Sequence, residues 1–551
     1  MEGANNHDAS RRSFLKATGA ATVAATSMGS LAGCLSNNSD GDGSGDGTLR
    51  YGRSAHSGTL DPQNTTSGEV AKVTNQIYDG LLNFAPGEAT LQKSLATDWS
   101  MDGESVTLTL RENAKFDDGT DFTADDFVAT YRRFVDEDYE YYFENASVYA
   151  GITLGSWIDS IEADGDYGLN ITLTQPYAPF FRNLAMFCVA VLSKDDIESG
   201  FDFNKDANGT GPFQLDNLDD AAKVVHLTPN DNYWGDAPKV DELQFQTIGE
   251  NAQRAQSLTQ DELEIIDTLN PSSIDIVEGS DAADVVTETG INIGYMSFNM
   301  SRVEAFRDRR VRRAISLAVD TQSIVEEVYS GIADQASQPC PPALFGHDDG
   351  IDPYAHDPDE AQSLLEDAGY GDGLSFELTT FQNSRGYNPD PSGTAQTIRT
   401  NLSDIGVEVE IDDRPFDDYL TYTSEGKHDA SLAGWYTDNA DPDNFYYALL
   451  HPQVESPDGQ DWVDWGTEGF NTSNRSAWAN QDFMDLVEEG QQTSEESERQ
   501  SLYHEAAQIA HDEAPWMYID YAQEIRGVST RVSGYTVSAI GGPHLHLVSV
   551  E

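Results

Sequence analysis

Alternating apolar and polar positions predict β-strands in the first half of the chain. In residues 104–111, Val106, Leu108 and Leu110 are apolar and their neighbours are polar. This period of two is typical of a strand with one buried face. Residues 169–173 repeat the pattern, so we expect a second strand of the same kind there.

Apolar positions at helical spacing predict helices in the second half. Val311, Ile315, Ala318 and Val319 lie on one face of a helix. Because glycine commonly follows the last turn of a helix, we expect Gly331 to end this one.

A second helix is predicted over residues 360–368, with Leu364 and Leu365 facing inward and Gly369 as its cap. Residues 401–411 then indicate a step from helix to strand. This mixed texture favours two α/β lobes over one large sheet, and a chain of 551 residues is long enough for both.

The charge balance excludes several classes of partner. The chain carries 96 Asp and Glu against 31 Lys and Arg, a formal net charge of −65. Phosphate would be repelled, so we expect no nucleic acid partner and no adsorption to an anionic membrane surface. With 38% hydrophobic and 10% aromatic residues, the chain is not a disordered acidic one. The charges indicate a halophilic surface that concentrated salt screens, and a fold that loosens at low salt.

The N-terminal segment contains two export motifs in order. Residues 10–16, SRRSFLK, resemble the twin-arginine export signal, and the apolar stretch after them is too short to span a bilayer. The sequence LAGC ending at Cys34 resembles a lipoprotein cleavage motif. We therefore predict a signal peptide over residues 1–33, lipid on the sulfur of Cys34, and a flexible Gly- and Asp-rich tether over residues 34–47.

No pattern in the chain predicts catalysis. Besides Cys34 only Cys188 and Cys340 remain, and we expect both to be small buried hydrophobic residues. His504, Glu505 and His511 do not have the HExxH spacing of a zinc protease. We predict that the chain is not an enzyme and that it needs no cofactor and no metal.

A series of segments, taken in order, resembles the extracellular solute-binding proteins of the dipeptide, oligopeptide and nickel class. These proteins are the substrate-binding subunits of ABC importers. Because a haloarchaeal source fits the acidic composition and the twin-arginine signal, we expect this chain to be of haloarchaeal type. The segments are residues 60–63, 77–82, 95–99, 110–111, 116–119, 122–127, 209–213, 232–235, 298–299 and 309–314.

The resemblance implies an α/β periplasmic-binding-protein fold with two lobes that close on the ligand by hinge motion. Lobe I would comprise residues 48–287, with an extra subdomain, and residues 516–551; lobe II would comprise residues 288–515. The implied partners are a short peptide, the permease and ATPase subunits, and the membrane through lipid on Cys34. We expect a monomer on the outer face of the cytoplasmic membrane.

Two motifs of the dipeptide-binding branch imply the residues that hold the ends of the ligand. Residues 384–389, SRGYNP, match a motif whose arginine holds the ligand carboxylate, here Arg385, and Tyr387 would wall the pocket. Arginine suits this task because its planar fork binds a carboxylate at two points. In residues 434–445 the first aspartate of the motif, Asp438, would pair with the ligand's α-amino group.

The same resemblance implies contacts along the peptide. The backbone from Gly434 to Thr437 would run beside the ligand as an added strand partner. Trp435 would form a second wall of the pocket, and Thr66 would contact the amino end of the ligand.

Other interpretations remain open for these residues. In so acidic a chain an aspartate is a solvated surface charge by default, and Arg385 has a structural ion pair as its alternative. Asp441 and Asp443, which flank a proline, are interpreted as turn or cap residues. Tyr149 ends an aromatic run that is mostly packing, although one member can contact ligand. The cargo alternatives are a longer peptide, a nickel chelate, haem or an oligosaccharide, and a chemosensory role is left open.

Overall fold

The computed structural model describes residues 47–147, 149–267, 269–382, 385–455, 457 and 459–551. The predicted signal peptide, Cys34 and the tether up to Asp46 lie outside these residues. Among the helices that the structure describes, none has the length and apolar character needed to cross a membrane.

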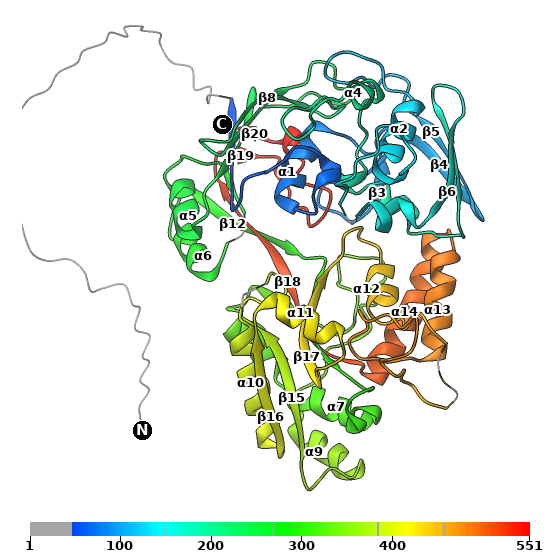
Figure 1. Cartoon of the computed structure of the whole chain (residues 1–551). Coiled ribbons are helices and arrows are strands. Elements are labelled where there is room, and N and C mark those ends of the chain that lie inside the picture. The colour runs from blue at the N-terminus through cyan, green and yellow to red at the C-terminus, as the bar shows by residue number, and fades with distance from the viewer. Residues whose placement is uncertain (1–46, 148, 268, 383–384, 456, 458) are drawn as a thin grey trace, which may run out of the picture. The chain divides into compact units, whose positions relative to one another are not determined.

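The largest sheet has twelve strands, with β18 near its middle. Figure 1 shows β18 as a long strand, and in the order of the sheet it has neighbours on both sides. The path is β16 (Val407–Arg414), β15 (Leu374–Phe381), β17 (Ala430–Tyr436), β13 (Asn292–Phe298), β18 (Trp516–Ser529), β11 (Ile265–Ile266), β1 (Thr48–Arg53), β10 (Glu242–Thr247), β9 (Val224–Pro229) and β8 (Phe213–Asp219), and β12 (Ala283–Thr289) and β14 (Ala333–Gln335) also pair with β18.

The long strand β18 changes partners along its length. Its first residues, from Trp516 to Asp520, pair with β13, and the next few pair with β14. From Gln523 to Ser529 it pairs with β12 instead. One strand therefore belongs both to the part of the sheet that contains β13 and β17 and to the part that contains β1 and β10.

Within the described ranges, three smaller sheets contain the remaining strands. They are β4 (Ala96–Asp102), β5 (Ser105–Leu110), β7 (Gly168–Leu173) and β6 (Ile158–Ala163); β2 (Leu82–Phe84) with β3 (Leu91–Lys93); and β19 (Val532–Ser533) with β20 (Ser549–Val550). In β5 every second side chain is buried, and the same holds in β7 from Leu169 onward. Both strands predicted from alternation are confirmed.

The helices lie between these strands in the chain. They are α1 (Gly68–Ile77), α2 (Ala124–Val135), α3 (Phe180–Asn183), α4 (Lys194–Ser199), α5 (Asn251–Thr259), α6 (Pro271–Glu278), α7 (Arg309–Ala318), α8 (Thr321–Ser323), α9 (Pro358–Asp367), α10 (Pro391–Asp404), α11 (Phe416–Ser424), α12 (Asp443–Leu449), α13 (Gln481–Gln492) and α14 (Glu496–Glu513). Shorter helical turns are η1 (Pro62–Asn64), η2 (Ala150–Gly155), η3 (Phe187–Val189), η4 (Glu304–Arg307), η5 (Ile324–Val328) and η6 (Leu545–Leu547).

The predicted end of α7 is wrong. The helix stops at Ala318, well before Gly331, because the side chain of Asp320 accepts a hydrogen bond from the backbone N–H of Ser323 and so begins α8. Gly331, with φ of +75°, follows η5 instead. The glycine predicted to cap α9 does adopt a left-handed conformation, since Gly369 has φ of +86°.

Candidate ligand-binding site

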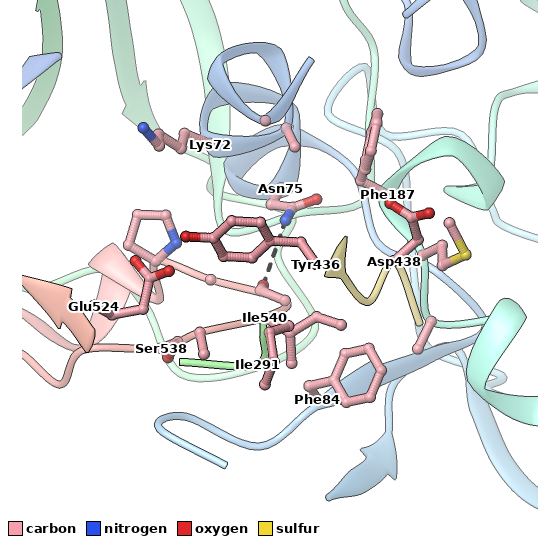
Figure 2. A pocket seen from close by; sticks show the side chains of 18 of the residues that line it. Lys72, Asn75, Phe84, Phe187, Ile291, Tyr436, Asp438, Glu524, Ser538 and Ile540 are labelled. Atoms are coloured by element: carbon pink, nitrogen blue, oxygen red, sulfur yellow. Dashed lines mark hydrogen bonds between the residues drawn. The ribbon is translucent and has the colours of Figure 1, made fainter. Parts of the chain in front are cut away.

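A cavity of about 360 Å³ lies among α1, the end of β17, the far half of β18 and the C-terminal segment. Three of the residues predicted to contact ligand line it: Thr66, Thr437 and Asp438. In Figure 2, Asp438 lies beside Phe187 on one side of the cavity, and Glu524 and Lys72 lie on the other. The cavity therefore has two chemically distinct ends.

Asp438 is mostly buried, and among the described residues the one hydrogen bond to its side chain comes from a tyrosine. The hydroxyl of Tyr149 donates to its Oδ1 at 2.7 Å. Burial raises the pKa of Asp438, and the hydrogen bond from Tyr149 partly offsets this rise. No Lys, Arg or His in the described part of the chain forms an ion pair with it. A partly desolvated carboxylate without a cation is suited to a cationic ligand group.

The loop after Asp438 is held by a buried ion-pair cluster. Asp441 has an exposed fraction of 0% and forms a two-point ion pair with Arg499, at 2.7 and 2.8 Å. Arg182, from α3, lies 3.5 Å from Asp441 and donates to the carbonyl oxygen of Ala440 at 3.0 Å. The turn-or-cap interpretation of Asp441 is correct only in part: its Oδ1 accepts from the backbone N–H of Asp443, but its main contacts are these arginines.

Arg385 does not line the cavity and has no carboxylate partner among the described residues. Its guanidinium carbon lies 3.5 Å from the ring centroid of Phe416, and its buried Nε has no hydrogen-bond partner in the part of the chain that the structure describes. The backbone groups of Arg385 and Asn388 exchange hydrogen bonds at 2.8 and 3.0 Å, which fixes the turn that carries the arginine. In a chain with 96 acidic residues, an arginine left without an ion pair is available to an anion.

Tyr387 packs against two glycines of the sheet. Gly434 and Gly294 are directly opposite each other in β17 and β13. A Cβ on Gly434 would overlap the ring of Tyr387, and a Cβ on Gly294 would lie 2.6 Å from the Tyr387 carbonyl oxygen. Tyr387 also lies beside Tyr436, whose ring lines the cavity, with ring centroids 6.2 Å apart.

Trp435 lies away from this cavity. Its indole Nε1 donates to the Oδ1 of Asn444 at 2.7 Å, which ties β17 to α12. Its assignment as a pocket wall stays a prediction.

One edge of β17 is open beside the predicted ligand residues. β15 pairs with β17 only at Ala430 and Ser431. From Gly434 to Tyr436, β17 has β13 as its one strand partner among the described residues. The backbone groups on the other edge are therefore available to an added strand.

The far end of the cavity contains charged residues that the sequence did not single out. Lys72 contacts the carboxylates of Asp267 and, at 2.6 Å, Glu69. Arg526 pairs with Glu524 at 2.8 Å. The signal in the sequence that could have drawn attention to Lys72 and Arg526 is the scarcity of basic residues. That scarcity does not indicate where in the fold a given basic residue lies.

Comparison with known proteins identifies the class. Residues 90–456 match the model of the bacterial extracellular solute-binding proteins, family 5. The chain is 30% identical over 522 residues to the dipeptide-binding protein of Escherichia coli (strain K12), covering 92% of this chain and 95% of that protein. It is 28% identical over 496 residues to heme-binding protein A of Haemophilus influenzae, covering 87% of each.

A solved structure extends the similarity to the fold. HbpA2 from Haemophilus parasuis is 26% identical to the chain, with a TM-score of 0.84, covering 92% of this chain and all of that one. The chain belongs to the family 5 extracellular solute-binding proteins. It has their mixed α/β periplasmic-binding-protein fold, is a non-enzymatic binding protein, and serves an ABC importer from outside the cytoplasmic membrane.

Proposed function

We propose that the chain captures dipeptides or other short peptides and delivers them to the importer's permease. The observation that carries this proposal is a pair of opposite charges that form no ion pair within the described part of the chain. Asp438 faces the cavity without a cation there, and Arg385 stands on the neighbouring loop without a carboxylate. A free peptide is a zwitterion that offers one group to each. The dipeptide-binding relative from Escherichia coli supports the same choice of cargo.

In the proposed complex the α-amino group of the ligand binds Asp438 and its carboxylate binds Arg385. The peptide backbone adds to the open edge of β17 between Gly434 and Thr437. Thr66 contacts the amino end, and Tyr387 and Trp435 wall the site. The lobes, residues 48–287 with 516–551 and residues 288–515, close around the ligand by hinge motion.

Closure explains why both charges are needed. Inside the closed site each ligand terminus must find its partner, because an ion buried without one costs about 3–5 kcal/mol. Side chains of the ligand can be recognised less strictly if water remains around them. The site would therefore select peptides by length and by free termini.

Calorimetric titration with Ala-Phe in multimolar salt tests this proposal. We expect one-to-one binding that is lost in Arg385→Ala and in Asp438→Asn, while Arg399→Ala, an exposed arginine on α10, binds as the parent does. N-acetyl-Ala-Phe and Ala-Phe amide should each fail to bind the parent. Absence of Ala-Phe binding by a folded parent would contradict the dipeptide assignment.

The same titration separates the other cargoes. The haem-binding relative makes haem the first alternative, followed by longer peptides, nickel chelates and oligosaccharides. Binding of haem that is unchanged in Arg385→Ala and Asp438→Asn would replace the peptide proposal.

Export and anchoring complete the proposal. We infer twin-arginine export through residues 10–16, lipid on Cys34, and a halophilic surface with a net charge of −65. Mass spectrometry of the membrane-bound protein should find a diacylglyceryl group on an N-terminal Cys34. Thermal unfolding should shift to lower temperature as salt is reduced, because self-repulsion is then less screened. A mature chain that begins elsewhere, or a melting temperature independent of salt, would contradict these inferences.

A further inference from the structure

A buried carboxyl group lies directly behind the loop that carries Arg385 and Tyr387. Asp520, on β18, has an exposed fraction of 0%, and neither of its side-chain oxygens has a hydrogen-bond partner among the residues that the structure describes. It occurs just before β18 leaves β13 and β14 to pair with β12. This aspartate is therefore at the point where the long strand changes partners.

The position of Asp520 is set by a row of residues across three strands. Gly434 of β17 is opposite Gly294 of β13, and Gly294 is opposite Asp520 of β18. Directly opposite residues in antiparallel strands share one face of the sheet. Tyr387 lies over the two glycines at one end of the row, so the carboxyl of Asp520 stands beside it on that face.

The glycine at position 294 allows the carboxyl and the loop to meet. A Cβ on Gly294 would overlap Oδ1 of Asp520 and would lie 2.6 Å from the carbonyl oxygen of Tyr387. Both oxygens thus approach the same small space above Gly294. Two acceptors directed at one small space repel each other unless one of them carries a proton.

The surroundings of Asp520 do not favour its ionised form. Its pKa is raised well above the usual value, with burial as the only cause. The titratable groups that face it are Tyr329, which directly follows η5, and Tyr436 from β17, each with a pKa that Asp520 helps to raise. A buried carboxyl group without a cation takes up a proton rather than remain charged, and then has one O–H to donate.

We propose that Asp520 is a positioning residue of the peptide site: its neutral carboxyl donates a hydrogen bond to the carbonyl oxygen of Tyr387 and so fixes the turn from Arg385 to Asn388 against the sheet. The role in ligand binding rests on the proposed function of Arg385. The hydrogen bond itself does not, because it belongs to the unliganded protein. Asp520 would thus connect the turn to β18, which pairs with β12 a few residues further on. The orientation of Arg385 would then depend on the position of β18.

Two measurements without ligand test the contact. In the first, amide hydrogen exchange is followed by mass spectrometry in the parent, Asp520→Asn and Asp520→Leu. Asparagine keeps a neutral donor, so we expect parent-like protection of the Arg385 and Asn388 amides. Leucine removes the donor, and exchange of these amides should become about tenfold faster while β5 keeps its protection. Equal protection of the turn in Asp520→Leu and the parent would overturn the proposal. Exchange of these amides in Asp520→Asn as fast as in Asp520→Leu would also overturn it.

In the second, infrared difference spectra of the parent minus Asp520→Asn at neutral pH report the proton directly. We expect the carbonyl stretch of a protonated carboxylic acid in the parent; a carboxylate difference band in its place would refute the neutral donor even if Asp520→Leu does not fold. Ala-Phe titration then separates the two proposals. Weaker binding in Asp520→Leu with rescue in Asp520→Asn supports the positioning role, and Ala-Phe affinity equal to that of the parent in a folded Asp520→Leu overturns it. If the parent binds no peptide, only the cargo proposal fails.

Discussion

Replacing Arg499 by methionine should strongly destabilise the protein. The guanidinium of Arg499 binds both oxygens of Asp441 and also donates to the carbonyl oxygen of Gly490 at 2.8 Å. Burial alone would raise the pKa of Asp441, but Arg499 and Arg182 outweigh it and hold this pKa below its usual value. Methionine keeps much of the side-chain volume and removes the charge, so Asp441 would lose its main partner.

The expected loss can be estimated from the geometry. Breaking a buried ion pair by removing one partner costs about 3–5 kcal/mol. Because Arg182 remains 3.5 Å from Asp441, part of the charge stays compensated, and we expect the lower end, about 3 kcal/mol. That is a large share of the 5–15 kcal/mol that typically separates folded from unfolded protein.

Urea unfolding in multimolar salt, followed by circular dichroism, measures this loss. Arg399→Met is the matched control, since Arg399 is exposed on α10 and its replacement should change stability by less than about 0.5 kcal/mol. The double variant Arg499→Met with Asp441→Leu removes both charges and should recover part of the loss. A cost for Arg499→Met no larger than that of the control would refute the assignment of this pair as a main support of the loop.

Three further outcomes are expected. Tyr149→Phe removes the hydrogen bond that lowers the pKa of Asp438, so the loss of dipeptide binding on acidification should begin at higher pH; titrations at a series of pH values check this, and an unchanged acid limb would contradict it. Burial raises the pKa of Asp443 in the folded protein to about 7, whereas an aspartate in the unfolded chain has a pKa near 4. The contribution of neutral Asp443 to the free energy of unfolding is therefore complete below about pH 4 and is lost as pH rises through about 7. The free energy of unfolding of Asp443→Asn, measured with urea, should therefore rise relative to that of the parent by about 2–3 kcal/mol between pH 5 and 8. A difference between the two proteins that does not change with pH would count against this pKa. Gly434→Ala would place a Cβ inside the ring of Tyr387 and should weaken Ala-Phe binding at least about tenfold in calorimetry, whereas parent-like affinity would mean that the loop can shift freely.

Local patterns predicted elements well where one interaction dominates. β5 and β7 followed from alternation because burial of one face decides a strand's register. The end of α7 did not follow, because Asp320 starts a new helix through a side-chain hydrogen bond that competes with the later glycine.

The candidate site was only partly accessible from the sequence. Asp438 and Thr66 were selected through motif context, and the structure places both at one cavity. Asp441 and Asp520 are two aspartates among 96 acidic residues, and nothing local marks either as buried. One becomes a paired ion and the other an unpaired acid because of residues far along the chain, and such long-range neighbours are not visible in a local pattern.

The sharing of β18 between the two parts of the large sheet has a consequence for biosynthesis. The residues of this strand leave the ribosome after those of β11, β12, β13 and β14, yet all four of these strands need it as a neighbour. Their pairing contacts span long sequence separations, which slow folding. Neither part of the sheet can be completed before β18 has emerged, so until then the nascent chain must keep its unpaired strand edges from aggregating.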